Sequence, residues 1–188
     1  MMLWLPYLLF VLFVAQSDHM PVSALPDKLL APDATKFDYF GSCVDLFEDL
    51  LVSSSIQDDD IDDRTGSVYS FHLSSNGDEW VFDEKIGLPD PLESSYFGTS
   101  LSLGREISGQ HQVLLGIGAE SYDSVGRAYI FKQHTSTRLW SHQATFRPTD
   151  ERYLQKFGAS GSIYADTYAV GSYADDGGAS RSGECHLI

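Results

Sequence analysis

DYFGSCVDLFEDLLVSSS, the stretch from Asp38 to Ser55, opens with an aromatic-glycine pair and continues as two strand-like runs. The same opening returns as SYFGTSLSL from Ser95 and as QKFGASGSI from Gln155, which places the three Phe-Gly pairs at 40–41, 97–98 and 157–158. Short runs of aromatic and β-branched residues between glycines are typical of strands. The stretch is therefore interpreted as the start of a repeating β unit.

Two further markers repeat with the same period as the Phe-Gly pairs. The run GSVYSF at 66–71 returns as GRAYIF at 126–131 and as GECHLI at 183–188. Tryptophan marks another position of the unit, at Trp80 in the first copy and Trp140 in the second. Three markers with one period indicate an internal repeat, the sequence signature of solenoids, propellers and arrays.

Each complete unit contains four strand-like runs, at 40–47, 49–55, 66–73 and 79–86 in the first and at 97–103, 112–118, 126–131 and 139–146 in the second. Four short antiparallel strands in about 60 residues make one blade of a β-propeller. The sequence therefore predicts an all-β partial propeller whose blades each have four antiparallel strands. Blade 1 is expected at 37–94, blade 2 at 95–154 and a partial blade 3 at 155–188.

The N-terminal segment, 1–24, resembles a targeting sequence. Leu3 to Ala15 is an apolar run of thirteen residues, too short to span a bilayer comfortably, and small residues allow cleavage after Ser17 or Ala24. No basic residue precedes the run, so an uncleaved anchor is the alternative. We expect residues 1–24 to be a signal peptide and leader, residues 25–36 to be a linker, and the protein to be secreted or on the cell surface.

Acidic residues dominate the chain, with 27 Asp and Glu against 12 Lys and Arg and a net charge of −15. Binding to nucleic acid needs a basic surface, so no nucleic-acid partner is expected. Between Asp45 and Asp63 there are eight carboxylates and no base. Such a block is typical of a solvated loop, with a cation site as the sharper alternative.

The order of these marks resembles the FG-GAP repeat. Phe-Gly and a small residue are followed by LLVSSS, LLGIGA or AVGSYA at the Gly-Ala-Pro position, then by an acidic loop and Gly-x-x-Tyr-x-Phe, although no copy keeps the proline. FG-GAP repeats build the N-terminal seven-bladed propeller of integrin α subunits and occur in many secreted or surface proteins. The resemblance covers residues 37–188 and implies an extracellular binding or adhesion module with a protein or glycan ligand.

The resemblance also implies calcium ligands in the first acidic loop. Asp58, Asp60 and Asp62 form a D-x-D-x-D run, and alternating carboxylates in a tight loop can converge on a hard cation. The family's loop continues with a glycine and a final acid, where this chain has Asp63 and Gly66. A solvated acidic loop is the alternative, although five aspartates in six positions repel one another unless a counter-ion is near.

The third unit aligns with this loop without a gap. Asp175 and Asp176 match Asp58 and Asp59, and they are the weaker candidates for calcium because Gly177 and Ala179 replace the other two carboxylates of the run.

No catalytic pattern emerges, and an enzyme is not expected. The six histidines are scattered, and the chain has neither a G-x-S-x-G motif nor a phosphate loop. Nothing selects one carboxylate pair for glycoside hydrolysis from so many acids. A part of a secreted propeller hydrolase is kept as an alternative.

Two full units and a third without its outer strand fall short of the four to eight blades of typical propellers. We expect either a fragment of a larger FG-GAP protein or a chain that completes its propeller by self-assembly, with a small open stack as the alternative. Cys43 and Cys185 fall in small-residue positions of different repeats and are expected to be two separate, mostly buried thiols rather than a disulfide.

Overall fold

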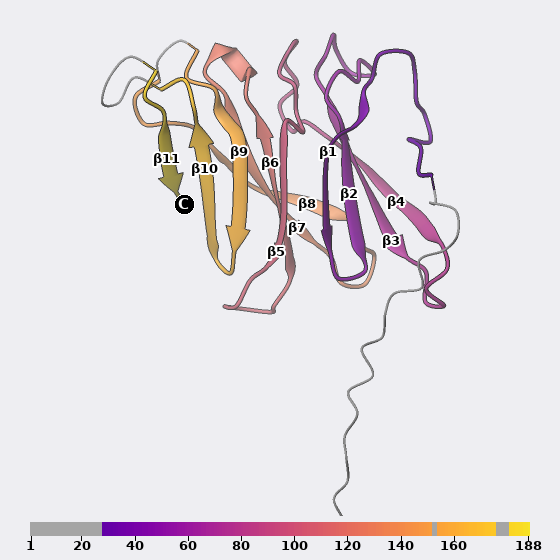
Figure 1. Ribbon diagram of the computed structural model, residues 1–188. Coiled ribbons are helices and arrows are strands. Elements are labelled where there is room, and N and C mark those ends of the chain that lie inside the picture. Colours follow the sequence, from indigo (N-terminus) through magenta and orange to yellow (C-terminus); the bar gives the residue numbers. More distant parts are fainter. Residues whose placement is uncertain (1–27, 152–153, 176–180) are drawn as a thin grey trace, which may run out of the picture.

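Three antiparallel sheets follow one another along the chain in the computed structural model, which describes residues 28–151, 154–175 and 181–188 (Figure 1). The first sheet has the order β1 (Phe40–Phe47), β2 (Leu50–Ser55), β3 (Ser67–Leu73) and β4 (Trp80–Gly87). The second has the order β5 (Ser100–Arg105), β6 (Val113–Ala119), β7 (Arg127–Gln133) and β8 (Trp140–Phe146). The third joins β9 (Phe157–Tyr164), β10 (Thr167–Ser172) and β11 (Glu184–Leu187), and a 3-10 turn, η1 (Tyr122–Ser124), follows β6.

The predicted all-β architecture of four-stranded blades is confirmed, and the observed strands fall on the predicted runs. Most boundaries differ by one or two residues, and the largest difference is in blade 2. The first strand of blade 2 begins at Ser100, after the Phe-Gly pair, because the backbone of Phe97 and Gly98 bonds elsewhere: the Phe97 N–H donates to Thr65 of blade 1 and the Gly98 N–H to Gly118. The predicted signal segment lies outside the described residues. No helix in the described part of the chain has the length and hydropathy needed to cross a membrane.

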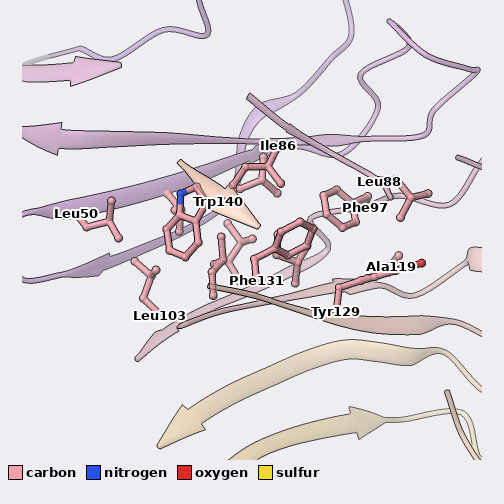
Figure 2. Close-up of a cluster of buried hydrophobic side chains, with 14 of the residues drawn as sticks. Leu50, Ile86, Leu88, Phe97, Leu103, Ala119, Tyr129, Phe131 and Trp140 are labelled. Atoms are coloured by element: carbon pink, nitrogen blue, oxygen red, sulfur yellow. The ribbon is translucent and has the colours of Figure 1, made fainter. Parts of the chain in front are cut away.

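Alternate residues of each strand face different blades, because side chains of a strand point to opposite sides of its sheet. Val52 and Val68 of blade 1, both fully buried, pack with Phe97 and Leu115 of blade 2 in the largest hydrophobic cluster. Figure 2 shows this cluster, in which Trp140 lies near Leu50. The sheets of blades 1 and 2 are thus apolar on both faces, as stacked blades require.

The outer face of blade 1 is covered by the chain that precedes it. Tyr69 and Phe71 point away from blade 2, and Ala31, 6% exposed, packs against them with Leu29 beside it. The stretch predicted as a linker therefore includes residues that bury apolar surface of the first blade.

The Phe-Gly pairs form the joints between blades. The Phe97 N–H donates to the Thr65 carbonyl at 2.8 Å, and the Phe157 N–H donates to the Val125 carbonyl at 3.0 Å in the same way. Each acceptor precedes a glycine of the repeat, and a Cβ on Gly126 would lie 2.1 Å from the Phe157 carbonyl oxygen. Both markers of the repeat thus have a structural reason, because they meet at the blade interface.

The two cysteines are free, as predicted, but the prediction that both are buried is wrong for Cys185, which is exposed, while Cys43 is half-buried. Cys185 pairs with Gly171, as Val68 pairs with Ser54 in blade 1. In blade 1 this face packs against the next blade, whereas in blade 3 no described residue covers Cys185.

Candidate functional site

The loops that differ most between the repeats lie along one edge of the molecule. This loop edge, at the top of Figure 1, contains the segment before β1 and the connections β2–β3, β4–β5, β6–β7, β8–β9 and β10–β11. Antiparallel strands place all these connections on the same side of each sheet. The first acidic loop therefore lies on the same edge as the corresponding loops of blades 2 and 3.

Lys85 lies at the centre of the carboxylates of blade 1. Its Nζ is 2.8 Å from Oδ2 of Asp33, 2.8 Å from Oδ2 of Asp58 and 2.5 Å from Oδ2 of Asp60. Asp58 is the buried member, at 3% exposure. An ammonium group therefore provides the counter-charge that the aspartate run requires.

Tyr69, fully buried beneath Lys85, completes the cluster. Its hydroxyl lies 2.7 Å from Oδ2 of Asp58 and 2.8 Å from Oδ1 of Asp33, and its one proton can be donated to either carboxylate. Lys85 Nζ also lies 5.3 Å from the centre of the Tyr69 ring. The tyrosine of the Gly-x-x-Tyr marker thus orients the first aspartate of the acidic loop.

The electrostatics of the cluster follow from these contacts. Burial disfavours the charged amine, but hydrogen bonds to the three carboxylates outweigh it and raise the pKa of Lys85. Burial and the hydrogen bonds to Asp58 and Asp33 raise the pKa of Tyr69. Burial alone would raise the pKa of Asp33, but the hydrogen bonds from Lys85 and Tyr69 outweigh burial and lower it. These shifts favour a charged Lys85 beside an ionised Asp33 at neutral pH.

Two of the three predicted ligands of this loop come together. Asp58 and Asp60 meet at Lys85, whereas Asp62 is exposed and its Oδ1 accepts from the backbone N–H of Asp63. Asp33 and Lys85 were not predicted from the sequence. A lone aspartate before the repeats carries no signal, and Lys85 could have been found only from its pairing with Tyr69 across the third and fourth strands.

These residues fit a calcium site only if Lys85 moves. Its ammonium group lies on the oxygens of Asp58 and Asp60 that a cation would use, and calcium needs six to eight oxygen ligands. Calcium at this loop stays a prediction. Lys85→Met should bind calcium more tightly than the natural chain, because the competing charge is removed. Calorimetric titration measures this, and equal affinities would contradict the competition.

Removing Lys85 should also destabilise the fold at neutral pH. Lys85→Met leaves the buried Asp58 without its cation, and a loss on the order of 2 kcal/mol is expected at pH 7. The lowered pKa of Asp33 means that its stabilising contribution is complete above the unfolded-state value of about 3.9 and is lost as the pH falls below it. The difference between the natural chain and the variant should therefore shrink at pH 3.

Urea unfolding at both pH values measures this difference. Lys36→Met is the control, since Lys36 is exposed and most surface substitutions change stability by less than about 0.5 kcal/mol. An equal loss for the two variants, or a loss from Lys85→Met that does not change with pH, would contradict the ion-pair account.

The loop of blade 3 is closed in the same way as that of blade 1. The Gly183 N–H donates to the Asp175 carbonyl at 2.9 Å, as the Gly66 N–H donates to the Asp58 carbonyl at 3.1 Å. Asp175 is fully buried, and Nε2 of Gln155 donates to its Oδ2 at 2.7 Å. Asp176, the other predicted ligand, lies outside the described residues.

Comparison with known proteins gives one result. A family model described as FG-GAP repeat matches residues 26–71 and 140–188. The first match spans β1, β2, the acidic loop and β3 as far as Phe71. The second spans β8 and blade 3. No curated protein matches the chain significantly.

Proposed function

The chain belongs to the FG-GAP repeat family, and on that premise we propose that it is an extracellular binding module of β-propeller type with a protein or glycan ligand. FG-GAP repeats are typical of extracellular or cell-surface proteins, which supports the proposed location. A rigid scaffold that presents variable loops is a common arrangement for binding proteins. We propose no catalytic role for this module.

The observation behind the proposal is that several loops of the loop edge expose large apolar side chains. Phe37 is 64% exposed, Ile61 53% and Tyr173 62%, and they belong to the segment before β1, the β2–β3 loop and the start of the β10–β11 loop. Aromatic side chains such as Phe and Tyr are enriched in protein interfaces relative to the rest of the surface. In blade 1, Ile61 stands among the exposed carboxylates of the acidic loop.

Binding of the full chain to a panel of immobilised extracellular-matrix proteins and neutral glycans tests the proposal. We expect saturable binding to at least one member, weakened by about tenfold or more in Ile61→Asp and in Tyr173→Ser, because truncated interface anchors typically cost more than about 1 kcal/mol. Tyr164→Ser is the matched control, since Tyr164 is 84% exposed at the β9–β10 turn on the opposite edge. Equal loss in the control, or no binding to any member, would argue against a site on the loop edge.

We also propose that another FG-GAP blade, from a second copy of the chain, covers the outer face of blade 3. The support is the shared register: Gly171 pairs with Cys185 as Ser54 pairs with Val68. In blade 1 the corresponding face packs against the Phe-Gly pair of blade 2. A Cβ on Gly98 would lie 2.5 Å from Cβ of Ser54. The corresponding face of blade 3 has small side chains and space for a similar joint.

Light scattering and thiol labelling of the full chain test this assembly. We expect a mass above that of one chain at high concentration, with labelling of Cys185 slowed on assembly. Cys43 should label slowly at every concentration, because burial raises the pKa of its thiol. A folded monomer with a freely reactive Cys185 at every concentration would contradict the assembly.

A further inference from the structure

Asp175, in blade 3, has a buried carboxylate oxygen without a hydrogen-bond partner among the residues that the structure describes. Its Oδ2 accepts from Gln155, whereas its Oδ1 is buried and accepts no hydrogen bond within the described part of the chain. Burying a charged oxygen without a partner is costly, and an orphaned group in a native fold calls for an explanation such as an ion or a proton.

A second unsatisfied group lies beside it. Nε2 of His186 is also buried without a hydrogen-bond partner and lies 3.6 Å from Oε2 of Glu184. Glu184 and His186 are two residues apart on β11, so their side chains project from the same face. One potential ligand atom from each of these residues and one from Asp175 all lie within 4.8 Å of one another.

Blade 1 shows how the same positions are satisfied elsewhere. Asp58 and Tyr69 occupy the positions of Asp175 and His186, and there the phenol donates to the aspartate while Lys85 supplies positive charge. In blade 3 an imidazole replaces the phenol, and among the residues described no ion pair joins Asp175 to a lysine or arginine. Within the described residues, Asp175 therefore has neither the phenol donor nor the lysine cation that Asp58 has in blade 1.

We propose that Asp175, Glu184 and His186 form a binding site for a divalent transition metal, with zinc as the ion that fits best. Two carboxylates and one imidazole are ligands that zinc takes at about 2.0–2.2 Å, and three protein ligands leave a fourth position for water. The imidazole disfavours calcium, which prefers oxygen ligands throughout. The site differs from the calcium loop in its ligand set, because two of the three ligands lie on a strand.

The surroundings orient two of the proposed ligands. Gln155, 1% exposed, holds the Asp175 carboxylate by a hydrogen bond to Oδ2, which leaves Oδ1 available for a ligand. The Phe157 ring packs edge-on against the His186 ring, with ring centres 5.1 Å apart. Such outer contacts commonly fix the orientation of metal ligands, and their loss costs about 10–100-fold in metal affinity.

Titration of the chelator-treated full chain with zinc chloride tests the site. We expect one equivalent to bind, and the melting temperature to rise with zinc concentration because a ligand of the folded state stabilises it. Cobalt(II) in place of zinc should give visible absorption bands, and millimolar calcium should not displace either ion.

His186→Tyr is the decisive variant, because it installs the residue that blades 1 and 2 have at this position, Tyr69 and Tyr129. The tyrosine should donate to Asp175 and preserve the fold while the zinc equivalent is lost. Glu184→Gln is the second variant, should the first fail to fold, and is expected to weaken zinc binding by about tenfold or more.

Two controls exclude other sources of zinc binding. Cys185→Ser removes the exposed thiol, which lies between the two β11 ligands and projects to the other face of the sheet, and His134→Ala removes an exposed histidine of the β7–β8 turn. Both should bind zinc as the natural chain does. Absence of binding to the natural chain, or binding unchanged by His186→Tyr and Glu184→Gln, would overturn the proposal.

Discussion

Replacing Gly126 with alanine should destabilise the chain by about 4 kcal/mol, through backbone strain and overpacking at a blade joint. The backbone φ of Gly126 is +101°, a conformation that side chains disfavour, and its Cβ would lie 2.1 Å from the carbonyl oxygen of Phe157. That oxygen belongs to the backbone of the next blade, so it cannot rotate away as a side chain could. Relief requires blades 2 and 3 to separate.

Gly77→Ala is the matched control for this joint. Gly77, in the β3–β4 turn, also has a positive φ, +75°, but nothing lies within 4 Å of the added Cβ. Only the conformational cost, about 1–2 kcal/mol, is expected. Urea unfolding of the full chain measures both variants, and equal losses would mean that the close approach of the two blades at Gly126 contributes nothing.

Phe97→Ala should have a comparable effect, about 3–5 kcal/mol, through a cavity between blades 1 and 2. Phe97 is fully buried, and its ring packs edge-on against Tyr129 and Phe131 at centre-to-centre distances of 5.5 and 6.2 Å. Figure 2 shows the three rings side by side in the cluster that joins the two blades. The Phe97 side chain thus stabilises the joint between blades 1 and 2, and close backbone packing at Gly126 stabilises the joint between blades 2 and 3.

Phe82→Ala gives the comparison for an aromatic residue outside the joints. Phe82 also contacts a ring, that of Phe71 at 5.7 Å, but it is 40% exposed. A loss of about 1 kcal/mol is expected, since less apolar surface leaves contact with its neighbours. Thermal or urea unfolding that ranks Phe82→Ala equal to or above Phe97→Ala would contradict the role assigned to the Phe-Gly pair.

Much of the fold could be predicted from the sequence because its signals are local. The Phe-Gly pairs, the alternating runs and the glycines before the third strands each specify a turn or a strand, and their repetition indicated the blade boundaries. The exposure of Cys185 could not be predicted in this way. It depends on whether another blade covers that face, which no local pattern encodes.

The candidate sites were harder to predict because their partners come from distant parts of the chain. The acidic loop was found from its spacing, but the contact between Asp33 and Lys85 arises only when the segment before β1 folds across blade 1. Likewise, Asp175 is separated from Glu184 and His186 by a loop whose closure brings them together. Only the alignment of His186 with Tyr69 could have drawn attention to that position.

Hydrogen exchange of the Phe97 and Phe157 amides, resolved by NMR, tests the central claim that blades are joined through their Phe-Gly pairs. Both amides donate across a joint, to Thr65 and Val125, so both should exchange as slowly as amides within the sheets. In Gly126→Ala the Phe157 amide should lose protection while the Phe97 amide keeps it. Exchange of both amides in the natural chain at the rate of exposed loops would contradict the account.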